Sequence, residues 1–140
     1  MLRDVMFGNR RRFRELLAGS EERIASNILA DRLKRLVGAG LLTREDTRPG
    51  QRAAYSLTEP AIQLVPVLAG LGAWGIRHRT ITPRLRVRAE LLASEGPKMQ
   101  AQFMDELREI HLGQPHRRSA RPRVTERLAN AYAYAYAPSE

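Results

Sequence analysis

The spacing of apolar and polar residues divides the first part of the chain into helical segments. Residues 1–8 are typical of the end of a helix that stops at Gly8, and residues 11–17 predict a short helix with its apolar side chains on one side. A turn at residues 18–22 separates this helix from a longer one expected over residues 25–37, after which glycines follow. The pattern therefore predicts two neighbouring helices joined by a short turn.

The next segment has the pattern of two short strands. Residues 42–46 and 53–56 are the expected strands, and a Pro-Gly pair within residues 47–51 marks a turn between them. Thr58 is then expected to cap a helix over residues 59–77. A hairpin followed by a helix is predicted here.

The remainder of the chain is helical and then loses its apolar period. Residues 84–93 and 97–112 have helical spacing. The second segment places five apolar residues on one stripe: Met99, Phe103, Met104, Leu107 and Ile110. Residues 113–140 have no sustained apolar period, so we expect a disordered basic tail.

Composition excludes several classes of protein. The chain has 140 residues, of which 43% are hydrophobic, so it can bury a real core. Cysteine is absent, which excludes disulfides, thiolate metal sites and thiol-based redox sensing. The longest apolar stretch, residues 61–74, is interrupted by polar residues, proline and glycine, and the N-terminus lacks a signal-peptide pattern. We therefore expect a soluble, cytoplasmic protein with no membrane partner.

The positive charge is distributed unevenly along the chain. Residues 1–79 contain 14 basic and 8 acidic side chains, residues 80–112 contain 5 of each, and residues 113–140 contain 5 and 2. The excess therefore belongs to the first segment and the tail, which favours a polyanionic partner such as nucleic acid or an anionic membrane.

The order of helix, turn, longer helix and hairpin is typical of a winged helix-turn-helix. In the helix over residues 25–37, the apolar side chains fall within one sector of about 140°: Ile28, Leu29, Leu33 and Leu36. The opposite face is polar and small, and carries Asn27, Ala30, Asp31 and Lys34. Asparagine can bond an adenine edge and lysine a guanine or a phosphate, while Ser26 can cap the helix or bond a phosphate.

Arg32 falls amid the apolar stripe of this helix. A partly buried charge in that position favours an ion-paired side chain that reaches to solvent along its stem. Direct contact with DNA is the alternative interpretation.

Arginines flank the longer helix on both sides in sequence. Arg48 is expected at the hairpin tip, with Arg44 on the first strand and Arg52 at the start of the second, where they suit the narrow, negative minor groove. Arg11 and Arg12 belong to a basic cluster that begins the first helix of the pair, which crosses the phosphate backbone in helix-turn-helix proteins. A solvated charged surface is the alternative for each of them.

Four stretches within residues 2–74 have the order and spacing of a known family: FGNRRRFREL, IASNILADRLKRLVGAGLLTRE, AAYSLTE and LVPVLAGLGAW. They resemble the HxlR family of bacterial transcriptional regulators, which are relatives of MarR. The resemblance implies that the helix over residues 25–37 reads the major groove, that the wing takes the minor groove, and that the protein acts as a homodimer on inverted repeats. The later stretch GPKMQAQFMDELREIHLG resembles a C-terminal helix of some members.

Three features depart from the family pattern. A typical member begins with a further helix, so this chain is expected to lack the first part of the N-terminal helix. Ala25 stands where a serine is usual, which leaves Ser26 as the nearest substitute cap. Members that sense electrophiles use cysteine, and this chain has none.

The sequence thus predicts a mainly α fold with a small β-hairpin: a winged helix-turn-helix DNA-binding domain over residues 1–79, a C-terminal helical extension over 80–112, and the tail. The expected partners are double-stranded DNA, a second copy of the chain and a small-molecule effector of unknown identity. No cofactor, metal or catalytic site is expected, because the histidines lack metal-ligand spacing: His78, His111 and His116. A winged-helix module that binds protein, and a non-specific nucleic-acid binder driven by the tail, are the alternatives.

Overall fold

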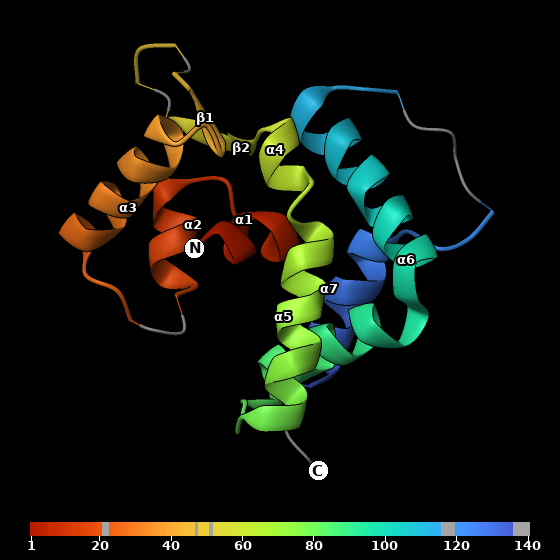
Figure 1. The fold of residues 1–140 in the computed structure, drawn as a ribbon. Coiled ribbons are helices and arrows are strands. Elements are labelled where there is room, and N and C mark those ends of the chain that lie inside the picture. Colours follow the sequence, from red (N-terminus) through yellow and green to blue (C-terminus); the bar gives the residue numbers. More distant parts are fainter. Residues whose placement is uncertain (21–22, 47, 51, 116–119, 136–140) are drawn as a thin grey trace.

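The computed structural model describes residues 1–140 except 21–22, 47, 51, 116–119 and 136–140. Its elements are, in order, α1 (Leu2–Gly8), α2 (Phe13–Ala18), α3 (Ser26–Gly38), β1 (Leu42–Glu45), β2 (Ala54–Leu57), α4 (Glu59–Ile62), α5 (Val65–His78), α6 (Pro83–Leu112) and α7 (Val124–Tyr134). The fold is a winged helix-turn-helix with C-terminal helices, as the sequence predicts. Helix α3 lies along one edge of the molecule, the hairpin projects beyond its C-terminal end, and α5 to α7 occupy the opposite side (Figure 1).

Strand β2 is paired on both of its edges. It forms an antiparallel pair with β1, in register from Leu42 opposite Leu57 to Glu45 opposite Ala54. On its other side Ala54 forms a bridge with Arg12, and the Tyr55 N–H donates to the Arg11 carbonyl at 2.7 Å. The segment that enters α2 therefore fixes the base of the wing.

Two expected helix ends differ in detail, and one is confirmed. Helix α1 includes Gly8, and the left-handed residue that ends it is Asn9, with φ 48°. Helix α3 begins after Ala25 without a side-chain cap, so the expected cap by Ser26 is wrong. The Thr58 hydroxyl accepts from the Ala61 N–H at 3.4 Å, as expected of a cap, and donates to the Gly40 carbonyl at 2.6 Å.

The helix expected over residues 59–77 is interrupted. Helix α4 ends at Ile62 and α5 begins at Val65, because Pro66 lacks an N–H and its ring clashes with the carbonyl four residues earlier. The helices expected over 84–93 and 97–112 are confirmed as the two arms of α6, which bends at Gly96, with φ 68° and ψ −156°.

The tail contains a helix that the sequence pattern does not predict. Helix α7 packs against α6 and α1, and it buries Val124 and Leu128. The carboxylate of Glu106, a residue with no exposed surface, accepts from the backbone N–H groups of Val124 at 2.8 Å and Thr125 at 2.9 Å. Because Glu106 satisfies free donors of the first turn, disorder is the wrong expectation for α7. The parts of the tail at 116–119 and 136–140 lie outside the described residues.

The apolar stripe of α6 is covered within the chain itself. Met99, Phe103 and Leu107 are buried, and the Phe103 ring stacks on Phe7 of α1 at 5.6 Å between centroids. Three of the five stripe residues therefore belong to the core, while Met104 and Ile110 are half-buried. The division into domains at residues 79 and 112 stays a prediction.

His111 joins the end of α6 to the wing. It is 8% exposed, and its Nδ1 atom accepts from the Leu57 N–H at 3.2 Å. Burial lowers the pKa of His111 from 6.5 to about 4, and the positive charge of Arg11 contributes in the same direction. The folded protein thus holds this imidazole neutral, as the acceptor role requires.

We expect stability to fall as the pH decreases from 6.5 towards 4. In this window the unfolded chain binds a proton at His111 that the folded chain does not, so the free energy of unfolding is highest above the unfolded pKa. The expected loss between about pH 7 and pH 5 is about 2 kcal/mol, measured by urea unfolding. His111→Gln keeps an acceptor and should remove most of this slope, whereas His78→Gln, at an exposed position, should retain it. Equal slopes for His111→Gln and the parent protein would contradict the assignment.

Candidate DNA-binding surface

Helix α3 has one packed side and one open side. Leu29 and Leu33 are each 1% exposed, and Leu36 packs against the same core. Ser26, at the start of the helix, is exposed, and so are all residues predicted for the outer face: Asn27, Ala30, Asp31 and Lys34. The packing that fixes the helix therefore directs this face to solvent.

Ile28 and Arg32 lie outside the packed sector, contrary to expectation. Ile28 is 45% exposed, and Arg32 is exposed as well. The three leucines of α3 span only about 60° of the helix, and Ile28 lies about 80° beyond Leu36. The core contacts too narrow a stripe of α3 to cover either side chain, so the expected partial burial of Arg32 is wrong.

The charges of the outer face of α3 are partly paired with one another. Asp31 forms an ion pair with Arg35 at 2.9 Å, and both side chains are largely exposed. Arg35 was not among the predicted contacts, although its i,i+4 spacing from Asp31 places it on the same face. Lys34 makes no ion pair with any residue that the structure describes. The one acidic group of this face is thus neutralised, and the lysine is available.

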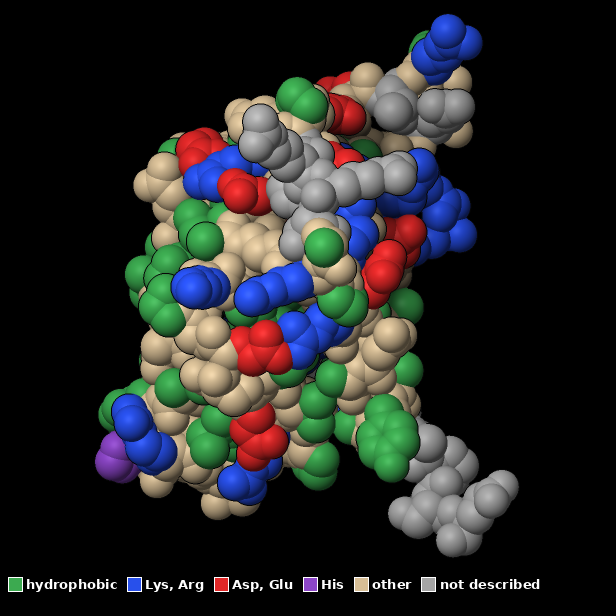
Figure 2. Space-filling view, turned by 90° about the vertical axis from the view of Figure 1, so that its right-hand side faces the viewer, with side chains coloured by type: hydrophobic (Ala, Val, Ile, Leu, Met, Phe, Trp, Pro, Cys, Tyr) green, Lys and Arg blue, Asp and Glu red, His purple; other side chains and the backbone are tan. Residues whose placement is uncertain are grey.

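The hairpin carries its predicted arginines at the surface. Arg44, Arg48 and Arg52 are all exposed, and Arg44 pairs with Asp46 at 2.9 Å. Basic side chains are visible at the hairpin tip, which protrudes at the top of the space-filling view (Figure 2). The turn predicted over 47–51 is described at Arg48, Pro49 and Gly50, where Gly50 has φ 90°; its other two residues lie outside the described part.

The basic cluster at the start of α2, which consists of Arg10, Arg11, Arg12 and Arg14, is divided between structure and surface. Arg11 is half-buried; its Nε donates to the Tyr55 carbonyl at 3.1 Å, and its Nη2 donates to the Ser56 hydroxyl. Arg10 donates to the Gly19 carbonyl at 2.7 Å and pairs with Asp4 at 3.3 Å. The predicted phosphate contact by Arg11 stays untested, but its guanidinium is already bonded within the fold.

Arg12 and Arg14 are the exposed members of this cluster. The backbone N–H groups of Arg11 and Arg12 both donate to the Glu15 carboxylate, at 3.0 and 3.2 Å. This carboxylate offsets the cost of placing positive charge at the N-terminus of α2. The sequence could indicate the cluster but not which arginine turns inward, because that depends on β2.

The N-terminus of α3 is open to a negatively charged group. Its N-cap, Ala25, provides no side-chain acceptor, and its first turn contains no acidic residue. The loop before it holds Arg23 in the left-handed region at φ 49°, with the Arg23 N–H donating to the Ser20 carbonyl at 3.2 Å. Free N–H donors at a helix N-terminus bind phosphate well, and Arg23 is a basic residue that the sequence analysis missed.

No metal site is formed by the described residues. Within the described part of the chain, no three carboxylate or imidazole side chains gather closely enough to hold a metal ion. His78 is exposed on α5, His111 is buried at the end of α6, and His116 lies outside the described residues.

The comparisons with known proteins agree with this geometry. Residues 1–83 match the sequence model of the HxlR-like helix-turn-helix family, whereas no curated protein and no solved structure matches the chain. The matched segment covers more than half of the chain and contains α1 to α5 with the hairpin, and thus every residue of the surface described above. The chain therefore belongs to the HxlR-like helix-turn-helix family of DNA-binding transcription regulators.

Proposed function

We propose that the protein is a sequence-specific transcription regulator that binds an inverted-repeat operator as a homodimer. The observation that carries the proposal is the outer face of α3, which is small, polar, neutral to basic and exposed, on a helix whose opposite face is locked into the core. Such a helix can enter the major groove without displacing other parts of the fold.

Asn27 and Lys34 are the proposed base readers. They lie seven residues apart, which is two helical turns and about 10 Å of axial rise, so they would address different base pairs of one half-site. Ala30 lies between them and leaves room for the edges of the bases. Ile28, exposed beside this face, is suited to an apolar contact with a thymine methyl group.

The proposed phosphate and minor-groove contacts surround these readers. The open N-terminus of α3, with Ser26 and Arg23, and the exposed Arg12 are suited to phosphates. The hairpin arginines, with Arg48 at the tip, are suited to the minor groove. These contacts fix the position of the protein on the duplex, and the α3 face supplies the discrimination.

The two alternatives agree less well with the surface. A module that binds protein would favour an acidic or apolar outer face, whereas this face pairs its one acid and exposes Lys34. A non-specific binder driven by the tail needs a free basic tail, but α7 is docked, with Arg127 paired to Glu95 and Arg123 paired to Glu109 at 3.1 Å.

The proposed dimer interface is the exposed side of α5. Val67, Leu71 and Trp74 are 61%, 62% and 44% exposed and follow one another at helical spacing. The span Glu59–His78 is long and apolar enough to cross a membrane by length and composition. Only 22% of an 18-residue apolar stretch within it is buried in the fold. Because this span is broken between α4 and α5, a second copy is a better cover for it than lipid. A regulator of this kind acts in the cytoplasm, where the DNA lies.

Replacing Asn27 or Lys34 with alanine should reduce operator affinity about tenfold or more while barely changing affinity for scrambled DNA. The chain offers matched controls, since Asn130 is exposed on α7 and Lys98, the only other lysine, is exposed on α6. Asn130→Ala and Lys98→Ala should leave both affinities unchanged. The operator is first selected from random duplexes by the parent protein, and anisotropy titrations are run at one salt concentration. Equal losses on both duplexes would reduce these residues to backbone contacts.

Arg48→Ala should affect DNA binding, whereas Arg11→Ala should affect the stability of the fold. Removing Arg48 should weaken binding to all DNA sequences alike. It should also make the fall of log affinity with log salt less steep by about one unit. Removing Arg11 should lower the melting temperature, because it deprives Tyr55 and Ser56 of their donor, and leave the salt slope unchanged. Salt titrations and thermal melts of both variants test this, with Lys98→Ala as the control. A lower salt slope for Arg11→Ala would restore its predicted phosphate contact.

Leu71→Glu should convert the dimer to a monomer, because a carboxylate in an apolar interface loses its hydration without gaining a partner. Sedimentation equilibrium at about 50 µM measures the change, since interfaces with dissociation constants near 1 µM are then largely associated. Leu112→Glu, at a leucine that is 38% exposed on α6, is the matched control and should stay dimeric. A parent protein that sediments as a monomer would refute the α5 interface.

A further inference from the structure

The C-terminal half of the outer face of α3 carries an ion pair that the proposed readers do not include. At about 100° per residue, the direction opposite the three core leucines of α3 falls within about 20° of Asp31. Lys34 and Arg35 lie on either side of Asp31 around the helix. The side chains of Asp31 and Arg35 are 57% and 80% exposed. This part of the face therefore presents a carboxylate between two basic side chains.

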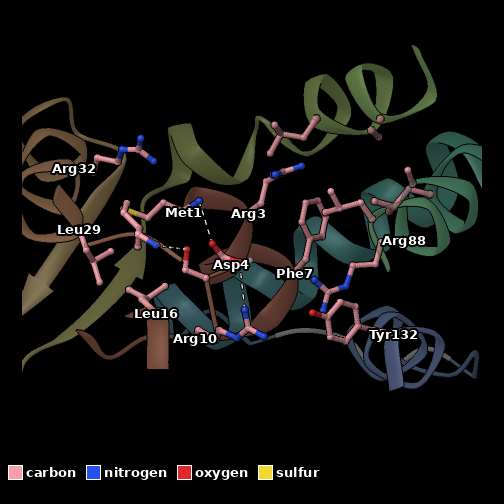
Figure 3. Close-up of a pocket in the computed structure, with 18 residues that line it drawn as sticks. Met1, Arg3, Asp4, Phe7, Arg10, Leu16, Leu29, Arg32, Arg88 and Tyr132 are labelled. Atoms are coloured by element: carbon pink, nitrogen blue, oxygen red, sulfur yellow. Dashed lines mark hydrogen bonds and ion pairs between the residues drawn. The ribbon is translucent and has the colours of Figure 1, made fainter. Parts of the chain in front are cut away.

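The two arginines of α3 lie on different sides of the helix. Figure 3 shows Arg32, together with Leu29, at the wall of a pocket that α3 shares with α1 on its inner side. Arg35 does not belong to that wall. Among the described residues, its one ion-pair partner is Asp31. Arg35 is thus the arginine of this helix that faces a duplex in the proposed binding mode.

Asp31 contacts the guanidinium of Arg35 through its Nε side. The ion pair joins the Arg35 Nε atom to the Asp31 Oδ2 atom at 2.9 Å. A guanidinium has five N–H donors, one on Nε and two on each Nη. No described residue other than Asp31 bonds this guanidinium. The outer edge of the guanidinium, which carries both Nη atoms, is therefore available to a second partner.

That outer edge has the geometry of a guanine reader. Two parallel N–H donors match the O6 and N7 acceptors that guanine presents in the major groove. A long side chain that is already held in place loses less conformational freedom when it binds. The pair itself is exposed, so it contributes little to the stability of the fold. A carboxylate on this face also weakens attraction to any DNA, and holding Arg35 in place compensates for that cost.

We propose that Arg35 reads a guanine in each operator half-site, and that Asp31 is the positioning residue that holds its guanidinium. Reading by Arg35 rests on the proposed function and adds a third base contact to the same face of α3. Two other roles are possible for the pair, and the experiments distinguish them. Arg35 would bond a phosphate without regard to sequence, or Asp31 would itself accept from the amino group of a cytosine.

The first experiment removes one acceptor from the DNA. The operator selected by the parent protein is synthesised with 7-deazaguanine, which pairs normally but lacks the N7 acceptor, at one guanine of the half-site at a time. At one position this replacement should lower the affinity of the parent about tenfold. Arg35→Ala should bind the natural operator about tenfold more weakly and should lose its sensitivity to 7-deazaguanine at that position. Arg86→Ala, which breaks an exposed i,i+4 pair with Glu90 on α6, is the matched control and should behave as the parent does.

The second experiment separates positioning from charge. Asp31→Ala should raise affinity for scrambled DNA, because a negative charge leaves the face, and yet lower operator affinity at least about threefold. In an Arg35→Ala background, Asp31→Ala should no longer lower operator affinity, since no guanidinium is left to hold. Glu90→Ala is the control for the loss of a paired acid and should leave both affinities unchanged. Thermal melts should show nearly equal stability for all these variants.

The guanine contact is overturned if no 7-deazaguanine weakens the parent, or if Arg35→Ala keeps the sensitivity of the parent at every position. The positioning role is overturned if Asp31→Ala raises affinity for both duplexes alike. It is also overturned if Asp31→Ala still lowers operator affinity without Arg35, which would make Asp31 a reader of cytosine. These results leave the proposed function standing. A parent protein that does not discriminate operator from scrambled DNA refutes the proposed function, and reading by Arg35 with it.

Discussion

The fold depends on the hydrogen bonds that β2 makes with the segments around it. Tyr55, Ser56 and Leu57 are buried, and burying their backbone polar groups is tolerable only when each finds a partner. The Arg11 backbone and guanidinium provide partners from the segment before α2, and His111 provides one from the end of α6. Two parts of the chain, each more than 40 residues from β2 in sequence, therefore converge on this short strand.

This convergence sets where the wing lies relative to α3. Thr58, directly after β2, donates its hydroxyl to the Gly40 carbonyl at the end of the α3 turn, and its N–H donates to the Leu41 carbonyl at 3.2 Å. The wing and α3 are thus connected by direct bonds at their common base, while their outer parts are exposed. Such an arrangement suits DNA recognition, which needs a rigid base and an accessible rim. It also explains why neutral His111 matters to the fold although it lies far from the exposed face of α3.

The sequence predicts well whatever depends on neighbours along the chain, and less well what depends on distant partners. The α3 boundaries, the hairpin and the Thr58 cap follow from local spacing, and they agree with the structure to within one or two residues. Helix α7 was missed because its N-terminal partner, Glu106, lies 18 residues earlier on another helix. Ile28 was misplaced because the helical wheel gives its direction but not the width of the surface that covers α3. The inward turn of Arg11 likewise depends on Tyr55, 44 residues away.

The same distinction decides how much of the positive charge can act on DNA. The chain has a formal net charge of +9, but several arginines neutralise acids or bond carbonyls within the fold. Arg108 bridges α6 to Glu59 at 2.7 Å, and its hydrogen bonds hold the pKa of Glu59 below its usual value. Arg86 pairs with Glu90 on the surface of α6, so the C-terminal side presents mixed charges, as Figure 2 shows. Arg12, at the N-terminus of α2, and Arg48, at the hairpin tip, are exposed and make no ion pair with a residue that the structure describes. Net charge alone therefore overstates the electrostatic attraction to DNA, and the position of each guanidinium determines which face of the molecule attracts it.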